Sequence, residues 1–125
     1  RVSDLLHTGE AIPRVQEHTS MKAVILEMTS KKFGLTTVDD SEGHLVGVIT
    51  DGDLRRGIEQ YADILLLNAS TLMSPHPRTI DTNSLAAEAL QTMEHHAITS
   101  LIVTDKQGST TGILHLHDIL KAGII

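Results

Sequence analysis

Two short segments of the sequence combine residue types that can hold an anion or a sugar. The first spans residues 47–53, GVITDGD, where an apolar run ends at a hydroxyl and two carboxylates. The length and β-branched content of residues 45–49 predict a buried strand, and Thr50 or Asp51 can cap a helix that follows it. Backbone N–H groups at a helix start suit phosphate. A carboxylate at Asp53 suits paired sugar hydroxyls.

The same arrangement returns in residues 112–120, GILHLHDIL. Asp118 takes the place of Asp53, and His115 takes the place of Thr50. Histidine is a poor helix cap, so an aspartate kept without its capping partner favours a binding role over capping alone. We expect the two segments to be unequal, with residues 50–53 the better formed.

Each of these residues also has a purely structural explanation. Thr50 and Asp53 fit a capping box, worth about 1 kcal/mol, and capping does not exclude binding. Arg55 and Arg56 point about 100° apart on a helix, so at most one can reach a ligand phosphate, and both can be solvated. His115 and His117 share a face of an extended segment and could chelate a metal with Asp118, but no cysteine or third histidine at ligand spacing supports this.

The composition of the chain argues against several classes of function. The 125 residues carry a net charge of −6, which argues against nucleic-acid or anionic-membrane binding. There is no cysteine, no serine elbow and no phosphate-binding glycine loop, so we expect no catalysis from this chain. Residues 64–67 are too few to span a membrane. The start at Arg1, without Met or a signal-like segment, leads us to expect a piece of a longer cytoplasmic protein.

The chain contains an internal duplication. Identical pairs 64 residues apart are Pro13/Pro77, Arg14/Arg78, Ser20/Ser84, Ala23/Ala87 and Leu26/Leu90; pairs 65 apart are Val38/Val103, Asp40/Asp105, Gly43/Gly108, Gly47/Gly112 and Asp53/Asp118. A near-constant offset over several elements indicates a repeat. We expect repeat 1 in residues 1–62, a connector in 63–68 and repeat 2 in 69–125.

Hydrophobic periodicity predicts the same order of elements in both repeats. The first has a helical turn in 1–7, an extended segment in 12–15, a helix opened by Ser20, strands in 35–38 and 45–49 and a helix to about Gln60. The second has a helical turn in 69–73, an edge strand before 80, a helix opened by Asn83 or Ser84, strands in 101–103 and 111–114 and a helix from about His117. The fold class is therefore α/β (α+β): two β-α-β-β-α repeats, expected to pack sheet to sheet about a pseudo-twofold axis.

This order, the repeat length and the closing Gly-h-h-[Thr/Ser]-x-x-Asp pattern, where h is apolar, resemble a tandem cystathionine-β-synthase (CBS) domain pair. A finer match is carried by TDGDLRR at 50–56, RVSDLL at 1–6 and HLHDILKAG at 115–123. These segments resemble the C-terminal CBS pair of bacterial D-arabinose 5-phosphate isomerases. In that family an N-terminal sugar-isomerase (SIS) domain, absent here, interconverts D-ribulose 5-phosphate and D-arabinose 5-phosphate for Kdo and lipopolysaccharide synthesis.

The resemblance implies a regulatory module that needs no cofactor and binds a nucleotide or nucleotide-sugar, AMP-type or CMP-Kdo. It implies contact with the SIS domain and oligomers: dimers of CBS pairs and a tetrameric parent. The expected ligand-binding residues are Thr50, Asp53, Arg56, Ser74, Pro75, His76, Pro77, Thr99, Ser100, His115, His117 and Asp118. His115 departs from the Thr/Ser of the pattern. His95 and His96 fit a helix C-terminus equally well without a ligand. The alternatives are a purely structural oligomerisation module and, less favoured, a metal sensor.

Overall fold

The computed structural model describes residues 1–123, which fall into two compact units. One unit is Pro13–Pro77 and contains Asp53, so we call it the Asp53 unit. The other combines Arg1–Ile12 with the chain from Arg78 onward and contains Asp118, so we call it the Asp118 unit. Each is a mixed α/β structure, and the two-repeat α/β architecture expected from the sequence is confirmed.

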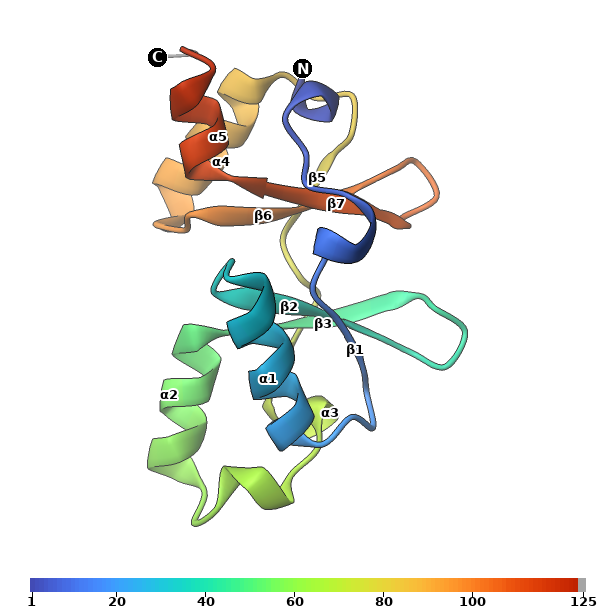
Figure 1. The fold of residues 1–125 in the computed structure, drawn as a ribbon, viewed down its shortest axis with the longest axis vertical. Helices are drawn as coiled ribbons and strands as arrows, with labels where there is room; N and C mark the ends of the chain where they lie inside the picture. Colours follow the sequence, from blue (N-terminus) through green and yellow to red (C-terminus); the bar gives the residue numbers. More distant parts are fainter. Residues whose placement is uncertain (124–125) are drawn as a thin grey trace. The chain divides into compact units, whose positions relative to one another are not determined.

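The Asp53 unit is built on a four-stranded sheet. Its elements are β1 (Arg14–Gln16), α1 (Met21–Lys31), β2 (Leu35–Asp39), β3 (Leu45–Thr50), α2 (Asp51–Gln60), the 3-10 helix η3 (Ile64–Leu66), α3 (Ala69–Leu72) and β4 (Ser74–Pro75). The sheet order is β1-β2-β3-β4, with β1 parallel to β2 and the other pairs antiparallel. Helices α1, α2 and α3 lie on one face of this sheet (Figure 1).

Local sequence explains where α1 begins and ends. The Ser20 hydroxyl accepts from the Ala23 N–H at 3.4 Å, as expected of a cap, and Lys32 ends the helix in the left-handed region with φ 68°. Met21, Val24 and Met28 recur at helical spacing on the buried face. They pack with strand residues Val38 and Ile49 in the unit's core.

The Asp118 unit repeats this plan with three strands. Its elements are the 3-10 helices η1 (Val2–Asp4) and η2 (Gly9–Ala11), β5 (Thr79–Asp81), α4 (Ala86–His96), β6 (Ser100–Thr104), β7 (Thr110–His115) and α5 (Leu116–Lys121). The order is β5-β6-β7, with β5 parallel to β6 and β6 antiparallel to β7. Helices α4 and α5 lie on one face of the sheet (Figure 1). Both repeats carry a register shift at one matched place, Val38/Asp39 in β2 and Val103/Thr104 in β6.

The start of α4 differs from the sequence prediction. Neither Asn83 nor Ser84 caps it; the N-cap is Leu85, whose side chain cannot accept a hydrogen bond. Asp81 instead accepts from the Asn83 N–H at 2.8 Å, and its carbonyl accepts from Ser84. Residues 81–84 therefore form a turn before the helix, and this turn holds Asn83 and Ser84 outside the N-cap position.

The compact units cut across the sequence repeats. Val2 is fully buried in the core of the Asp118 unit, and its N–H donates to Ser84 at 2.9 Å. His7 and Ile113 exchange backbone hydrogen bonds of 2.9 and 3.0 Å. In the same way Ala69 is fully buried in the core of the Asp53 unit. The opening segment of each repeat thus completes the sheet and core built by the other repeat.

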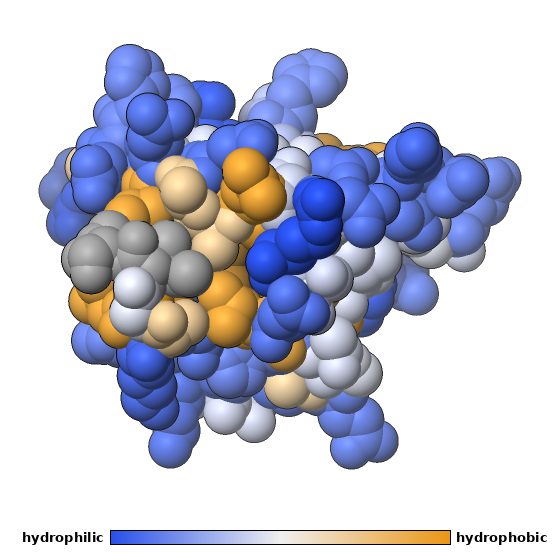
Figure 2. Space-filling model, turned by 90° about the horizontal axis from the view of Figure 1, so that it is seen from above, coloured by the Kyte–Doolittle hydropathy of each residue, from blue (hydrophilic) through white to orange (hydrophobic). Residues whose placement is uncertain are grey.

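The face of the Asp118 unit at its α5 end is hydrophilic over much of its area and carries an apolar region (Figure 2). Figure 2 looks onto the α5 end of this unit and shows apolar residues gathered in one part of that face. Leu85 and Leu120 are 50% and 41% exposed. Within residues 1–123, no helix has the length and hydropathy needed to cross a bilayer.

Candidate functional site

Asp53 is the centre of a hydrogen-bonded cluster at the start of α2. Its Oδ2 accepts from the Thr50 N–H at 2.9 Å and the Thr50 hydroxyl at 3.1 Å. Its Oδ1 accepts from Arg56 Nη2 at 2.8 Å and from the Ser74 hydroxyl at 2.9 Å. The Asp53 N–H donates back to Thr50 Oγ1 at 3.2 Å, which completes a capping box. Three of the predicted binding residues, Thr50, Arg56 and Ser74, therefore meet at the fourth, Asp53.

The cluster leaves Asp53 little capacity for a further partner. A carboxylate has about four lone-pair sites, and four donors already occupy them. Asp53 is 7% exposed, whereas the Arg56 side chain is 61% exposed. Of the two arginines considered from the sequence, Arg56 makes the contact, and Arg55 is exposed. A sugar diol could bind Asp53 only by displacing one of these donors, and Arg56 is the one with room to move away.

Asp118, the counterpart in the second repeat, has a different environment. Its Oδ2 lies 2.8 Å from His7 Nε2, and the Asp118 side chain is 24% exposed. No residue of the described range 1–123 donates to its Oδ1. His7 and Ser74 are matched positions, because Ser3/Ser70, Leu6/Met73 and His7/Ser74 share an offset of 67. Each repeat therefore supplies, through its opening segment, a partner to the aspartate of the other repeat.

His115 does cap α5, which corrects the sequence prediction that histidine would be a poor cap. Its Nδ1 accepts from the His117 N–H at 3.0 Å. The two rings are stacked, with centroids 4.8 Å apart. Burial, His117 and His7 lower the pKa of His115, while Asp118 raises it, and the net direction is downward. A neutral imidazole keeps the Nδ1 lone pair available for the cap.

The remaining predicted residues lie on two short segments. Pro75 pairs with Gly47 as part of β4, and His76 is exposed with a left-handed φ of 57°. Pro77 follows it and is half-buried. Thr99 is exposed, and its carbonyl accepts from Leu116 at 2.8 Å, while Ser100 is buried and pairs with His115. The two segments thus lie beside the starts of α2 and α5 within their own units.

The sequence interpretation missed His7. Its role depends on a contact across 111 residues, which local spacing does not reveal. The sequence does hold a signal for this contact. Residues 3–7 match residues 70–74 at an offset of 67, which differs from the offsets of 64 and 65 in the rest of the repeat.

Two glycines make room for the opening segments. A Cβ on Gly47 would lie 2.6 Å from Met73 Sδ, and one on Gly112 would lie 2.7 Å from the His7 carbonyl oxygen. Only glycine allows so close an approach without displacement. Gly47 therefore leaves room for the strand that carries Ser74, the partner of Asp53. Gly112 leaves room for the segment that carries His7, the partner of Asp118.

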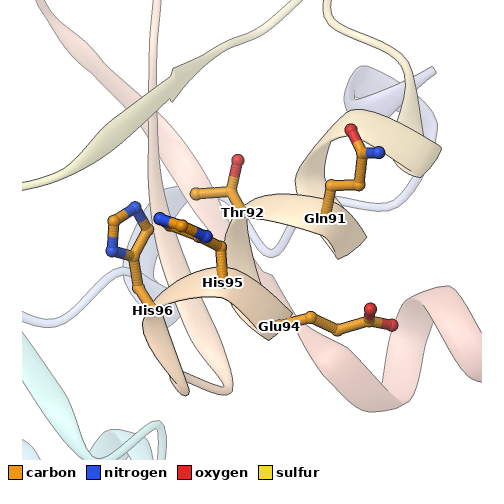
Figure 3. A pocket seen from close by; sticks show the side chains of 5 residues that line it. All are labelled: Gln91, Thr92, Glu94, His95 and His96. Carbon is orange, nitrogen blue, oxygen red and sulfur yellow. The ribbon is translucent and has the colours of Figure 1, made fainter.

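A hollow of about 560 Å³ lies over the last turns of α4 (Figure 3). The His95 and His96 rings meet edge to face, 4.6 Å apart, and Glu94 points away from them (Figure 3). Burial is the main cause that lowers the pKa of His96, followed by the charges of Arg78 and His95. The Glu94 carboxylate is not directed at the two histidines (Figure 3). Within residues 1–123, no three His, Cys, Asp or Glu side chains converge as metal ligands.

The sequence matches the family model of the CBS domain twice, over residues 2–60 and 69–124. The chain belongs to the CBS domain family. Over all 125 residues it is 40% identical to the arabinose 5-phosphate isomerase KdsD of Pseudomonas aeruginosa and 38% identical to that of Escherichia coli K12. The chain spans 38% of the length of each of these relatives.

The fold of the CBS pair is also found in a solved structure. A CBS domain protein from Pyrobaculum aerophilum, complexed with AMP, matches with a TM-score of 0.84 and 22% identity, over 100% of this chain and 99% of that one. The resemblance to CBS pairs and to arabinose 5-phosphate isomerases that the sequence motifs indicated is confirmed. At 22% identity the structural match shows the fold alone. The argument for a function rests on the isomerase relatives.

Proposed function

We propose that this chain is the regulatory CBS pair of an arabinose 5-phosphate isomerase and that it binds a nucleotide or nucleotide-sugar. The observation that carries the proposal is the match along the whole chain to KdsD isomerases at 38–40% identity. The parent reaction interconverts D-ribulose 5-phosphate and D-arabinose 5-phosphate in the cytoplasm, for Kdo and lipopolysaccharide synthesis. Its catalytic residues belong to an SIS domain outside this chain.

The chemistry of the two aspartate segments supports a ligand with a diol and a phosphate. The Asp118 carboxylate can accept from vicinal hydroxyls, as can that of Asp53 once Arg56 moves away, and the exposed guanidinium of Arg56 can then pair with a phosphate. AMP meets both requirements and is the ligand of the Pyrobaculum aerophilum neighbour. CMP-Kdo meets them too, and as an end product of the pathway it would act as a feedback signal. Neither ligand needs a resident cofactor.

Regulation follows if the ligand binds two arrangements of the whole protein with different affinity. The ligand then shifts their populations and, by linkage, changes the activity of the attached isomerase domain. Oligomers of the parent would carry the change to neighbouring subunits.

Isothermal titration of this chain with AMP, ATP, CMP and CMP-Kdo tests the proposal. We expect saturable heat with at least one of them, and a change in isomerase activity of the full-length protein at the same concentration. No heat with any of the four at millimolar concentration would overturn ligand binding. Heat without an effect on the isomerase would overturn regulation.

A second candidate, assembly of isomerase subunits, is favoured by exposed apolar side chains in the Asp53 unit. Leu66 is 82% exposed, Leu65 50% and Ile58 65%. Contiguous apolar side chains in solvent are typical of association surfaces, and Leu65 and Leu66 are neighbours in η3. Sedimentation velocity distinguishes the two functions: a ligand-independent dimer that Leu66→Asp dissociates, together with nucleotide-insensitive isomerase activity, favours assembly.

A further inference from the structure

We infer that the isomerase domain of the parent protein docks on the Asp118 unit, over the exposed apolar side chains of Leu85 and Leu120. This inference rests on the proposed function, in which a sugar-isomerase domain precedes Arg1. It assigns the contact with that domain to one unit of the pair and to named side chains, which the sequence motifs do not do.

The path of the chain determines where a preceding domain is joined. The Arg1 guanidinium donates to the Asn83 carbonyl at 2.7 Å, and the Val2 N–H donates to the Ser84 carbonyl at 2.9 Å. Val2 is fully buried in the core of the Asp118 unit. The chain is therefore held against residues 83 and 84 from its first two residues onward, and a domain before Arg1 is joined beside the start of α4. Such a tether raises the effective concentration of that domain at this face to about the millimolar range.

Apolar side chains are exposed where the chain enters the unit. Leu85 follows Ser84 directly and is exposed at the N-cap of α4, a position that usually has a polar residue. Leu120 is exposed on α5, which contacts α4. Figure 1 shows the first residues, the start of α4 and α5 at the same end of the unit, and Figure 2 shows apolar residues gathered on the face at that end. An apolar region of this kind is typical of an interaction site.

The Asp53 unit is not joined directly to a preceding domain. It also exposes apolar side chains, among them Ile58 and Leu66, but its first residue, Pro13, follows Ile12 of the Asp118 unit. The tether therefore favours docking on the Asp118 unit.

This contact gives the proposed regulation a physical route. Helix α5 carries Leu120, and Asp118, one of the proposed binding residues, lies in its first turn. A ligand that shifts α5 changes the docking face, and by linkage docking changes the affinity for that ligand.

Cysteine labelling tests the contact, because this chain has no cysteine of its own. Leu85→Cys and Leu120→Cys place thiols on the proposed docking face, and Leu26→Cys, at an exposed position of α1 in the Asp53 unit, is the matched control. Labelling rates are measured by mass spectrometry of the peptide that carries the new thiol, in this chain and in the full-length isomerase, without nucleotide. We expect the two docking-face thiols to react at least about tenfold more slowly in the full-length protein, because a covered thiol reacts only when the contact opens. Leu26→Cys should react equally in both proteins.

Equal labelling of the docking-face thiols in the two proteins overturns the inference, as does equal slowing at Leu26→Cys. A rate that falls in this chain alone as its concentration rises also overturns it, because a second copy then covers the face. As a second measurement, Leu120→Asp should leave nucleotide binding by this chain unchanged and abolish the effect of the nucleotide on isomerase activity, whereas Leu26→Asp should preserve both. A full nucleotide effect in Leu120→Asp contradicts the proposed route. Because the labelling needs no nucleotide, absence of nucleotide binding overturns the proposed regulatory function and leaves the docking contact standing.

Discussion

Deleting the Asp53 carboxylate is expected to destabilise the Asp53 unit by about 2–3 kcal/mol. The lost Ser74 hydrogen bond contributes about 1 kcal/mol, whereas the Asp53 N–H keeps its hydrogen bond to Thr50 Oγ1 in the alanine variant. Asp53→Ala also leaves the half-buried Thr50 N–H without its acceptor, which adds about 1–2 kcal/mol. Arg56 adds little to the loss, because its side chain is 61% exposed and returns to solvent.

The chain offers a direct probe of this unit. It has one tyrosine and no tryptophan, and Tyr61 packs against the core of the Asp53 unit. Tyrosine fluorescence during urea unfolding therefore reports the unit that the substitution affects, and circular dichroism follows the whole chain.

Asp118→Ala is the matched control, since it removes one partly exposed contact with His7 and should cost about 1 kcal/mol or less. The reasoning is refuted if Asp53→Ala lowers the free energy of unfolding by less than Asp118→Ala does. It is also refuted if the tyrosine transition of Asp53→Ala coincides with that of wild type.

Three further predictions concern packing and titration. Gly112→Ala should lower stability by about 1–3 kcal/mol in urea unfolding, and more than Gly47→Ala, because its Cβ meets the His7 backbone rather than a flexible methionine. Burial, opposed by Arg14, raises the pKa of Asp39, whose Oδ1 is buried without a hydrogen-bond partner in the described part of the chain. Ionising Asp39 therefore costs stability as pH rises above its folded pKa, so Asp39→Asn should raise the Tm at pH 7 and lose this advantage near pH 4; an equal shift at both pH values contradicts it. The lowered pKa of His115 means that its stabilisation is present above its ordinary value of 6.5 and is lost as pH falls through the folded pKa. Thermal unfolding between pH 7 and 5 should show this loss in wild type, and His115→Thr should reduce it.

Local rules were sufficient for the strand–helix segment around Thr50. Residues 45–49 were predicted as a strand and the helix was expected to end near Gln60; the structure has Leu45–Thr50 and Asp51–Gln60. The signals are local: an apolar β-branched run, a threonine cap and an aspartate three residues on. The capping box predicted for this segment is confirmed.

Contacts that depend on the path of the chain could not be predicted in this way. The His7–Asp118 pair joins residues 111 apart, and the pairing exists because the opening segment of one repeat docks in the unit formed by the other. A cap provided by an imidazole nitrogen, as at His115, also escapes propensity rules, since these rank residue types by their average behaviour. At Leu85 the same rules failed because the turn that Asp81 forms with Asn83 and Ser84 holds both polar residues outside the N-cap position.

The comparison of Asp53 and Asp118 shows how capping a helix uses up the lone pairs of a carboxylate. Every donor that fixes a carboxylate in place removes a lone pair that a ligand would use. The complete Thr-x-x-Asp box therefore holds Asp53 at the start of α2 and satisfies it, whereas the histidine substitution leaves α5 capped by His115 and releases Asp118 from capping. The departure from the family pattern at His115 thus leaves α5 capped by an imidazole nitrogen, while the Asp118 carboxylate contacts His7 instead of a capping partner.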